Sequence, residues 1–550
     1  MDLLLAFILA MALTMALIPA LMRRAGAMHV LDAPAERKVH ERPMPRVGGI
    51  AMAVGVAVPL LLWLDLDRLA AAYLASALIV LLFGVWDDRV TLSPGIKFLG
   101  QLIAVHIVVL VGGVEIHSVT LASRIELPAI IAAPLTALFL LGVTNAINLS
   151  DGLDGLAGGT TFLCCVAIAL LSFGTDLAFV STVAVVVMGG LLGFLRYNSF
   201  PARVFMGDGG SQFLGFTVGV LAVLLTQNEA LPFSAALPLL LLGLPILDTL
   251  TVITIRLREG RSPFSADKNH LHHRLLGRGF EHFEAVAVIY LLQGLLFLLA
   301  WQLRYYSDVT IVAVFIGFAA TLLLALFAAE RRGWRWHGLG EFRLGTARVS
   351  ETLVRLKQPR RMPRWTAIVV MGCVLMYFAS VAIAVGPIGK DIGWLAVGLC
   401  AVLGLAVLQR SEMPGIAAVT QGALYVAVVM AVYLDHVAAD LPELFEYAKL
   451  AIFPVLTLAV VLRLRLSRER RFEVTPLDLL VIFVALALPN LPGLRGAPSN
   501  LGFSVAKLVV MFYALEMLAG HSARTKAWLW RSGAVFLAVL AVRGLVLTSG

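Results

Sequence analysis

The chain has 550 residues, of which 60% are hydrophobic and only 14% are charged, and its mean hydropathy is +0.92. Soluble domains are about 45–50% apolar and about 25% charged, so this composition excludes a soluble globular protein and indicates a chain that crosses a membrane many times. The formal net charge is +9. In a membrane protein such an excess predicts cytoplasmic loops beside anionic lipid, with no nucleic-acid partner.

Apolar runs of about the length that a bilayer requires recur from end to end. They predict an all-α, polytopic membrane protein with about eighteen transmembrane helices. The predicted ranges are 3–21, 48–64, 69–86, 96–113, 128–146, 159–174, 178–195, 211–227, 233–255, 284–302, 308–328, 366–386, 391–409, 414–434, 447–464, 476–491, 501–519 and 531–548.

The distribution of Lys and Arg predicts the orientation of these helices. Basic residues cluster after the first, ninth, eleventh and fifteenth predicted helices. If the N-terminus lies outside, all four clusters face the cytoplasm, as the positive-inside rule requires. The longest basic connector divides the chain into a first membrane domain (1–330), the connector itself (331–365) and a further helical domain of unassigned role (366–550).

The polar stretch NAINLSDGLDGLAGG, residues 145–159, follows an apolar run and is the densest group of candidate site residues. Asp151 and Asp154 lie three residues apart, so they would share one face if the segment were helical. Asn148 precedes them. Acidic and amide groups at a membrane edge are costly to dehydrate and usually serve an ion, a substrate or each other. The alternative is a solvated turn between two helices, which favours the same residue types.

Other acidic residues fall at the same predicted side of the membrane. Asp87 and Asp88 end the third predicted helix, and Lys97 begins the fourth. Asp208 lies between glycines in VFMGDGGSQ, just before a new helix, where free N–H groups suit a phosphate. Asp248 lies inside the ninth apolar run, where a lone carboxylate is a functional candidate.

The loop after the ninth predicted helix carries RLREGRSPFSADKNHLHHRL. His270, His272 and His273 lie there beside Arg261 and other arginines. The histidines could bind a transition metal, but the interleaved arginines favour phosphate binding. Carboxylates for a hard cation together with Arg, Lys and His for phosphates predict a Mg²⁺-dependent phosphoryl-transfer site.

The strings VWDDR, NAINLSDGLDGLAGG, VFMGDGGSQ and GRSPFSADKNHLHHRL resemble the signatures of the polyprenyl-phosphate N-acetylhexosamine-1-phosphate transferases (glycosyltransferase family 4 type). So does RKVHERPMPRVGG, in which the resemblance implies that Lys38, His40 and Arg46 bind substrate. It also implies a UDP-N-acetylhexosamine donor, a polyprenyl phosphate acceptor, Mg²⁺ or Mn²⁺, released UMP, and catalytic loops on the cytoplasmic side of a bacterial inner membrane. A homodimer is possible within this family type.

HLHH is similar to the branch that uses UDP-GlcNAc to start O-antigen, enterobacterial common antigen or teichoic acid assembly. The branch that makes the first lipid intermediate of peptidoglycan, the phospho-N-acetylmuramoyl-pentapeptide transferases, usually shows three successive histidines followed by Phe-Glu. That pattern is absent here. Residues 366–550 lie outside the resemblance.

The resemblance also implies residue roles. Asp208 resembles a direct metal ligand, with Asp151 as a second, and Asp151 and Asp154 would hold the site and the nucleotide end. Asp87 resembles a residue that either deprotonates the lipid phosphate or attacks as a nucleophile, and both remain open. Direct attack by the lipid phosphate is favoured because it needs no covalent enzyme intermediate. The residues expected to bind the donor are Lys97, Asn148, Asp248, Arg261, His270, His272 and His273, with Asp88 completing the catalytic set.

Two rival functions are compatible with the helix count. A transporter or lipid-carrier binding protein would perform no chemistry, but transport sites usually lie near the bilayer midplane, whereas these acidic groups lie at helix ends. A degenerate transferase serving as an assembly subunit would have lost acidic motif residues, and all of them are present.

Overall fold

The computed structural model describes residues 3–32, 43–121, 123–262, 269–336, 364–384, 388–409, 414–437, 451–459, 501–519 and 523–545. The chain divides into two compact units, whose described parts are residues 3–336 and 364–545, and each unit is described by itself. Lys38, His40 and nearly all of the predicted connector 331–365 lie outside the described residues. The predicted domain limits stay a prediction.

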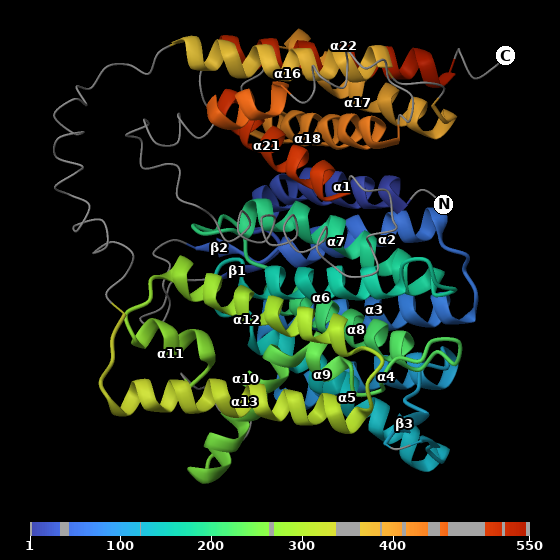
Figure 1. Cartoon of the computed structure of the whole chain (residues 1–550), viewed down its shortest axis with the longest axis vertical. Helices are drawn as coiled ribbons and strands as arrows, with labels where there is room; N and C mark the ends of the chain where they lie inside the picture. The colour runs from blue at the N-terminus through green and yellow to red at the C-terminus, as the bar shows by residue number, and fades with distance from the viewer. Residues whose placement is uncertain are drawn as a thin grey trace. The chain divides into compact units, whose positions relative to one another are not determined.

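The first unit is a bundle of helices (Figure 1). Its helices are α1 (Leu3–Arg24), α2 (Gly48–Trp63), α3 (Arg68–Val90), α4 (Pro94–His106), α5 (Ala129–Leu149), α6 (Leu156–Ser172), α7 (Ala178–Asn198), α8 (Gly207–Thr226), α9 (Pro238–Leu241), α10 (Gly243–Arg258), α11 (Leu271–Gly277), α12 (His282–Leu303) and α13 (Asp308–Arg331), and α4 runs on into a π-helical turn, η1 (Ile107–Val111).

Two small antiparallel hairpins connect helices of this unit. In the first, β1 (Leu31–Asp32) pairs with β2 (Met44–Pro45) so that Asp32 lies opposite Met44. In the second, β3 (Ser118–Thr120) pairs with β4 (Arg124–Glu126). The first hairpin lies next to the start of α2.

The second unit contains α16 (Arg364–Ala384), α17 (Lys390–Gln409), α18 (Pro414–Val437), α21 (Leu501–Ala519) and α22 (Ala523–Leu545). Helices α17 and α22 pack closely where Gly393 meets Gly544. Inside this unit, the Lys507 ammonium lies 2.6 Å from the buried Asp435 carboxylate, which also accepts a hydrogen bond from the Tyr377 hydroxyl at 3.2 Å.

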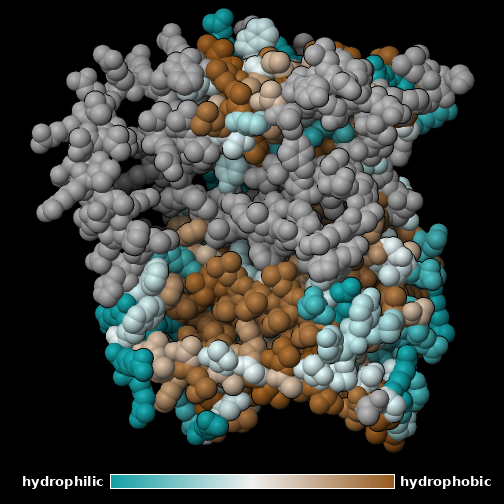
Figure 2. Space-filling view, in the orientation of Figure 1, coloured by the Kyte–Doolittle hydropathy of each residue, from teal (hydrophilic) through white to brown (hydrophobic). Residues whose placement is uncertain are grey.

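The protein is a polytopic membrane protein. Among the described residues, ten helices are long and apolar enough to cross a bilayer, and five shorter apolar helices accompany them. Figure 2 shows apolar residues gathered over one face of the first unit, with hydrophilic residues toward its two edges. The total of eighteen spans stays a prediction, because range 476–491 and much of 447–464 lie outside the described residues. The outside position of the N-terminus also stays a prediction.

One predicted helix, 233–255, is interrupted in the structure. Helix α9 ends at Leu241 and α10 begins at Gly243. Pro245 has no N–H to donate to the carbonyl four residues earlier. That carbonyl, on Leu241, instead accepts from Gln293 Nε2 at 2.9 Å and from the Cys164 thiol at 3.1 Å. The Leu241 carbonyl therefore keeps hydrogen-bond partners although the helix is interrupted beside it.

Helix α8 is the centre of the first unit. It is buried along almost its whole length and packs against α2, α3, α5 and α6. Its first turn approaches two neighbouring helices at glycines. A Cβ on Gly84 of α3 would overlap the backbone of Gly209, and a Cβ on Gly49 of α2 would overlap that of Gly210. Small residues at these crossings set how close the two polar helix ends come to α8.

This packing predicts the effect of a single methyl group. Gly84→Ala should lower the thermal stability of the purified protein, because overpacking a helix crossing costs about 1–3 kcal/mol. Gly142→Ala in α5 is the matched control, since a Cβ there meets nothing within 4 Å. Thermal unfolding in one detergent compares the two, and equal melting temperatures would contradict the close packing of α3 on α8.

Candidate active site

The predicted site residues converge at one end of the first unit. They lie at the C-terminal ends of α3 and α5, at or just before the N-terminal ends of α4, α6 and α8, in the first half of α10, and in α11. Because successive helices run in opposite directions, segments separated by more than a hundred residues meet there. The charged side chains described below therefore share one small region.

Asp88 binds the start of α8. Its two carboxylate oxygens accept hydrogen bonds from the backbone N–H groups of Asp208 at 3.0 Å and Gly209 at 3.2 Å. The N-terminus of a helix has free N–H groups and a positive dipole end, so a buried carboxylate is well stabilised there. Gly207 adopts φ +74°, and a Cβ on it would lie 2.5 Å from Asp88 Oδ2. Only glycine allows this contact without strain.

Lys97, near the start of α4, joins two carboxylates from different helices. Its ammonium forms ion pairs with Asp87 on α3 and, at 3.1 Å, with Asp208 on α8. The other oxygen of Asp87 accepts the Leu92 backbone N–H at 2.6 Å. Asp87 and Asp88 are adjacent in sequence but contact different partners. Asp87 pairs with Lys97, whereas Asp88 accepts hydrogen bonds from the start of α8.

Asn148 holds the second oxygen of Asp208. Its side-chain amide lies 3.2 Å from Asp208 Oδ1 and 2.8 Å from Ser211 Oγ. One helical turn further into the bundle, Gln101 bonds Asn145 at 2.8 Å and Gln212 at 3.0 Å. These amides satisfy one another inside the bundle and fix α4, α5 and α8 together below the carboxylates.

Asp151 lies in the loop between α5 and α6. Among the described residues its carboxylate makes no hydrogen bond or ion pair. Burial raises the pKa of Asp151 to about 7, and the negative charges of Asp208, Asp88 and Asp154 raise it in the same direction while Arg46 opposes them. A carboxyl group in this position binds either a proton or an added cation.

Asp154 points to a different partner. Residues 150–155 are not helical, so the two aspartates do not share a helix face. The Asp154 carboxylate accepts the Ala202 backbone N–H at 2.9 Å, and its own N–H donates to His282 Nε2 at 3.1 Å. The His282 ring in turn stacks on Phe200 at 4.4 Å. Asp154 thus ties the loop to the segments after α7 and before α12.

Asp248 of α10 organises the histidine segment. One carboxylate oxygen lies 2.7 Å from His270 Nδ1, and the other accepts the Leu271 backbone N–H at 2.7 Å. The second bond is made at the start of α11. Asp248 therefore acts on the donor-binding candidates His270 and His272 through the placement of this short helix.

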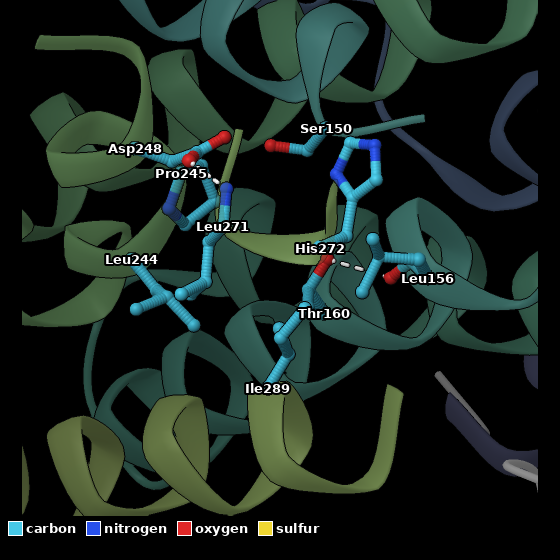
Figure 3. A pocket seen from close by; sticks show the side chains of 9 residues that line it. All are labelled: Ser150, Leu156, Thr160, Leu244, Pro245, Asp248, Leu271, His272 and Ile289. Atoms are coloured by element: carbon cyan, nitrogen blue, oxygen red, sulfur yellow. Dashed lines mark hydrogen bonds between the residues drawn. The ribbon is translucent and has the colours of Figure 1, made fainter. Parts of the chain in front are cut away.

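His272 lines a pocket with Ser150 and Asp248 on its polar side and with apolar residues opposite them (Figure 3). Its ring packs against Gly152, where a Cβ would overlap the imidazole. Burial, and after it the nearby His273, lower the pKa of His272 to about 3. His272 is thus a neutral hydrogen-bonding group at physiological pH and adds no positive charge.

The predicted arginines differ in their contacts. Arg46 pairs with Asp32 and lies 3.6 Å from Asp88 Oδ1, so the first hairpin reaches the acidic group. Arg261 forms an exposed pair with Glu259 at 2.8 Å, and no described contact joins it to the acidic group. His273 lies 4.3 Å from His272, ring to ring.

Several residues that support the site had no distinctive sequence signal. Ser211 and Gln212 lie inside a quoted motif, but their partners come from α4 and α5. Asn198 accepts the Gly155 N–H at 2.9 Å and donates to the Val204 carbonyl at 2.9 Å. His282 is a lone histidine at a helix start, and only the fold shows that it contacts Asp154.

Comparison with known proteins identifies the family. A model described as glycosyl transferase family 4 matches residues 70–226. A protein of Bacillus subtilis named probable undecaprenyl-phosphate N-acetylglucosaminyl 1-phosphate transferase is 37% identical over 59% of this chain and 90% of its own length. The chain belongs to glycosyl transferase family 4.

Two further family-4 relatives agree with this assignment. A decaprenyl-phosphate N-acetylglucosaminephosphotransferase of Mycolicibacterium smegmatis is 35% identical over 54% of this chain and 82% of its own length. An undecaprenyl-phosphate alpha-N-acetylglucosaminyl 1-phosphate transferase of Escherichia coli K12 is 30% identical over 48% and 74%. The residues matched by the family-4 model lie wholly in the first unit and include Asp87, Asp88, Lys97, Asp151 and Asp208.

The contacts of Asp88 predict that it orients Asp208. Asp88→Ala should remove both bonds to the start of α8 and abolish activity, in addition to lowering stability by about 1–3 kcal/mol. Asp67→Ala is the control, because Asp67 caps the other end of α3 by accepting the Ala70 N–H at 2.8 Å. Both variants should lose stability, and only Asp88→Ala should lose turnover per folded molecule. Retained turnover in Asp88→Ala would contradict the orienting role.

Proposed function

We propose that this family-4 enzyme transfers N-acetylglucosamine 1-phosphate from UDP-GlcNAc to a polyprenyl phosphate and releases UMP. An oxygen of the lipid phosphate would form a bond to the sugar-bearing phosphorus while the bond to the UMP oxygen breaks. UMP would leave with the bonding electron pair, and the product would be a polyprenyl diphosphate carrying the sugar. The names of the relatives support this proposal, and so do the carboxylates of Asp87 at the end of α3 and Asp208 at the start of α8, which Lys97 joins.

The single observation that carries the proposal is the Asp87–Lys97–Asp208 group beside Asp151. Phosphoryl transfer depends on placing two phosphates in line and neutralising their charge. Lys97 supplies one fixed positive charge at the acidic end of the bundle. Asp87 pairs with Lys97, and in this direct attack it would act as the base that takes the proton of the lipid phosphate.

The donor set fits a divalent cation. Among the described residues, no three His, Cys, Asp or Glu side chains are grouped closely enough to hold a metal by themselves. Mg²⁺, however, is usually bound by one or two carboxylates together with substrate phosphates. Asp208 and Asp151 are the residues that would hold it, and Mn²⁺ could substitute. The bound cation would neutralise charge on the diphosphate.

The elements around the site suggest how the substrates are divided. The histidine helix α11, with His272 against Gly152, would bind the UDP-sugar diphosphate through neutral imidazole donors and nearby arginines. The prenyl chain would remain in the membrane, against the apolar surface of the first unit. We place the site on the cytoplasmic side of a bacterial inner membrane, because the basic loops would then face inward.

The first test is UMP release from UDP-sugars by the purified full-length chain with a polyprenyl phosphate. The enzyme should accept UDP-GlcNAc in preference to other UDP-N-acetylhexosamines. Release only with UDP-N-acetylmuramoyl-pentapeptide would favour the peptidoglycan branch. A folded protein that binds polyprenyl phosphate and releases no UMP from any donor would favour a lipid-carrier protein without chemistry.

Asp208→Asn should reduce turnover by at least about 100-fold, because it removes a charge that both Lys97 and the cation need. It should also weaken Mn²⁺ binding, which titration calorimetry measures without turnover. Asp65→Asn, at an exposed loop between α2 and α3, is the control with the same chemical change. Normal turnover and normal Mn²⁺ binding in Asp208→Asn would contradict the assignment.

The lowered pKa of His272 predicts which replacement it tolerates. A neutral imidazole donates one hydrogen bond, so His272→Gln should keep more activity than His272→Ala. The alanine variant should mainly raise the KM for the UDP-sugar, and His272→Gln should leave the shape of the pH–rate profile between about pH 6 and 8 unchanged. His106→Ala on the exposed side of α4 is the control. Loss of a titration step near neutral pH in His272→Gln would show that His272 acts as a charged group.

A further inference from the structure

Helix α11 carries the histidines of the proposed donor site but is only seven residues long. A helix of this length is marginal by itself, so its position depends on its anchors. Asp248 holds the N-terminal end, as described above. The C-terminal end has a second anchor, and it comes from the last turn of α13 and the residues that follow.

The second anchor begins with ion pairs to Glu330. Arg274 of α11 approaches Glu330 Oε1 with its Nε at 3.1 Å and with a terminal guanidinium nitrogen at 3.0 Å. Arg278, just after α11, lies 3.5 Å from the same oxygen. The side chains of Arg274 and Glu330 are 16% and 34% exposed. Partial burial strengthens charge-assisted hydrogen bonds relative to those of surface ion pairs. Two arginines near the histidines are thus committed to one carboxylate.

The residues after α13 add backbone and aromatic contacts. The Trp336 N–H donates to the Arg278 carbonyl at 2.7 Å, and the Trp336 ring stacks on Phe280 at 5.3 Å and 5°. Gly279 lies between them with φ +91°, and a Cβ there would lie 2.5 Å from the Trp336 carbonyl oxygen. The absence of a side chain at Gly279 therefore lets the segment that follows α13 pack closely against the backbone there.

We propose that Glu330 and Trp336 are positioning residues for the donor site: together they clasp the C-terminal end of α11 and hold His272 against the loop that contains Gly152. The inference rests on the proposed UDP-sugar transfer. It assigns a residue in the last turn of α13 and one just after that helix to the donor site, although none of the site motifs includes them. Glu330 touches no proposed reacting group, so it acts through Arg274 and the placement of α11.

The kinetic test compares Glu330→Gln with Glu330→Asp in the full-length chain. Glu330→Gln keeps the shape of the side chain and removes the charge, so it should raise the KM for the UDP-sugar by about three- to tenfold with kcat nearly unchanged. Glu330→Asp keeps the charge and should therefore raise the KM for the UDP-sugar less than Glu330→Gln does. The control is Glu126→Gln, which breaks the exposed Glu126–Arg124 pair at 3.3 Å on the far hairpin and should leave KM unchanged.

A second measurement needs no turnover. Hydrogen exchange followed by mass spectrometry, in the absence of substrate, should show faster exchange of the amides of residues 271–277 in Glu330→Gln and in Trp336→Ala. Trp336→Phe keeps an aromatic ring for Phe280 and should exchange more slowly than Trp336→Ala. The double variant Glu330→Gln with Trp336→Ala should be less than additive, because both changes release the same helix.

The outcomes separate the clasp from the proposed function. If the unaltered chain releases UMP from UDP-GlcNAc but Glu330→Gln keeps its donor KM and its α11 exchange rate, the clasp is wrong and the proposed function stands. If the unaltered chain uses no UDP-sugar while Glu330→Gln still loosens α11, the proposed function fails and the clasp becomes a scaffold contact. Loss of folded protein with unchanged KM in the remaining folded fraction would also overturn the positioning role.

Discussion

The site depends above all on the two hydrogen bonds by which the Asp88 carboxylate accepts the amides of Asp208 and Gly209 in the first turn of α8. They fix the start of the most buried helix against the end of α3, and they place the Asp208 side chain toward Lys97. A buried carboxylate is costly unless its oxygens are satisfied, and here two N–H groups of a helix N-terminus satisfy them. The glycines at the α2, α3 and α8 crossings let the helices come close enough for these bonds to form.

Much of this arrangement could be predicted from the sequence. The order of polar motifs along alternating helices placed Asp87, Asp151 and Asp208 at one end of the bundle, and the structure brings them there. The motifs alone could not predict that Asp87 and Asp88 contact different partners. Neighbouring residues on a helix point in different directions, and the sequence does not show what lies in each direction. That distinction comes from α4 and α8, which lie far away in sequence.

The differences have identifiable physical causes. Pro245 marks the break before α10 in the sequence, but the side chains from α6 and α12 that satisfy the Leu241 carbonyl come from far along the chain and could not be predicted from the apolar run. The partners of Asp154 are a backbone N–H after α7 and a histidine at the start of α12, whereas its spacing from Asp151 suggested a shared face if the segment were helical. Local patterns predict elements and their ends, and long-range hydrogen bonds decide which way each polar group faces.

The position of α11 depends on contacts at its two ends, because the helix is too short to be stable by itself. Seven residues cannot form a stable helix unaided, and the histidine-rich sequence has no strong helix preference. Asp248 of α10 binds one end. Glu330 binds the other end from the last turn of α13. The position of this short helix thus depends on both α10 and α13. Small movements of either would change where His272 lies relative to Gly152.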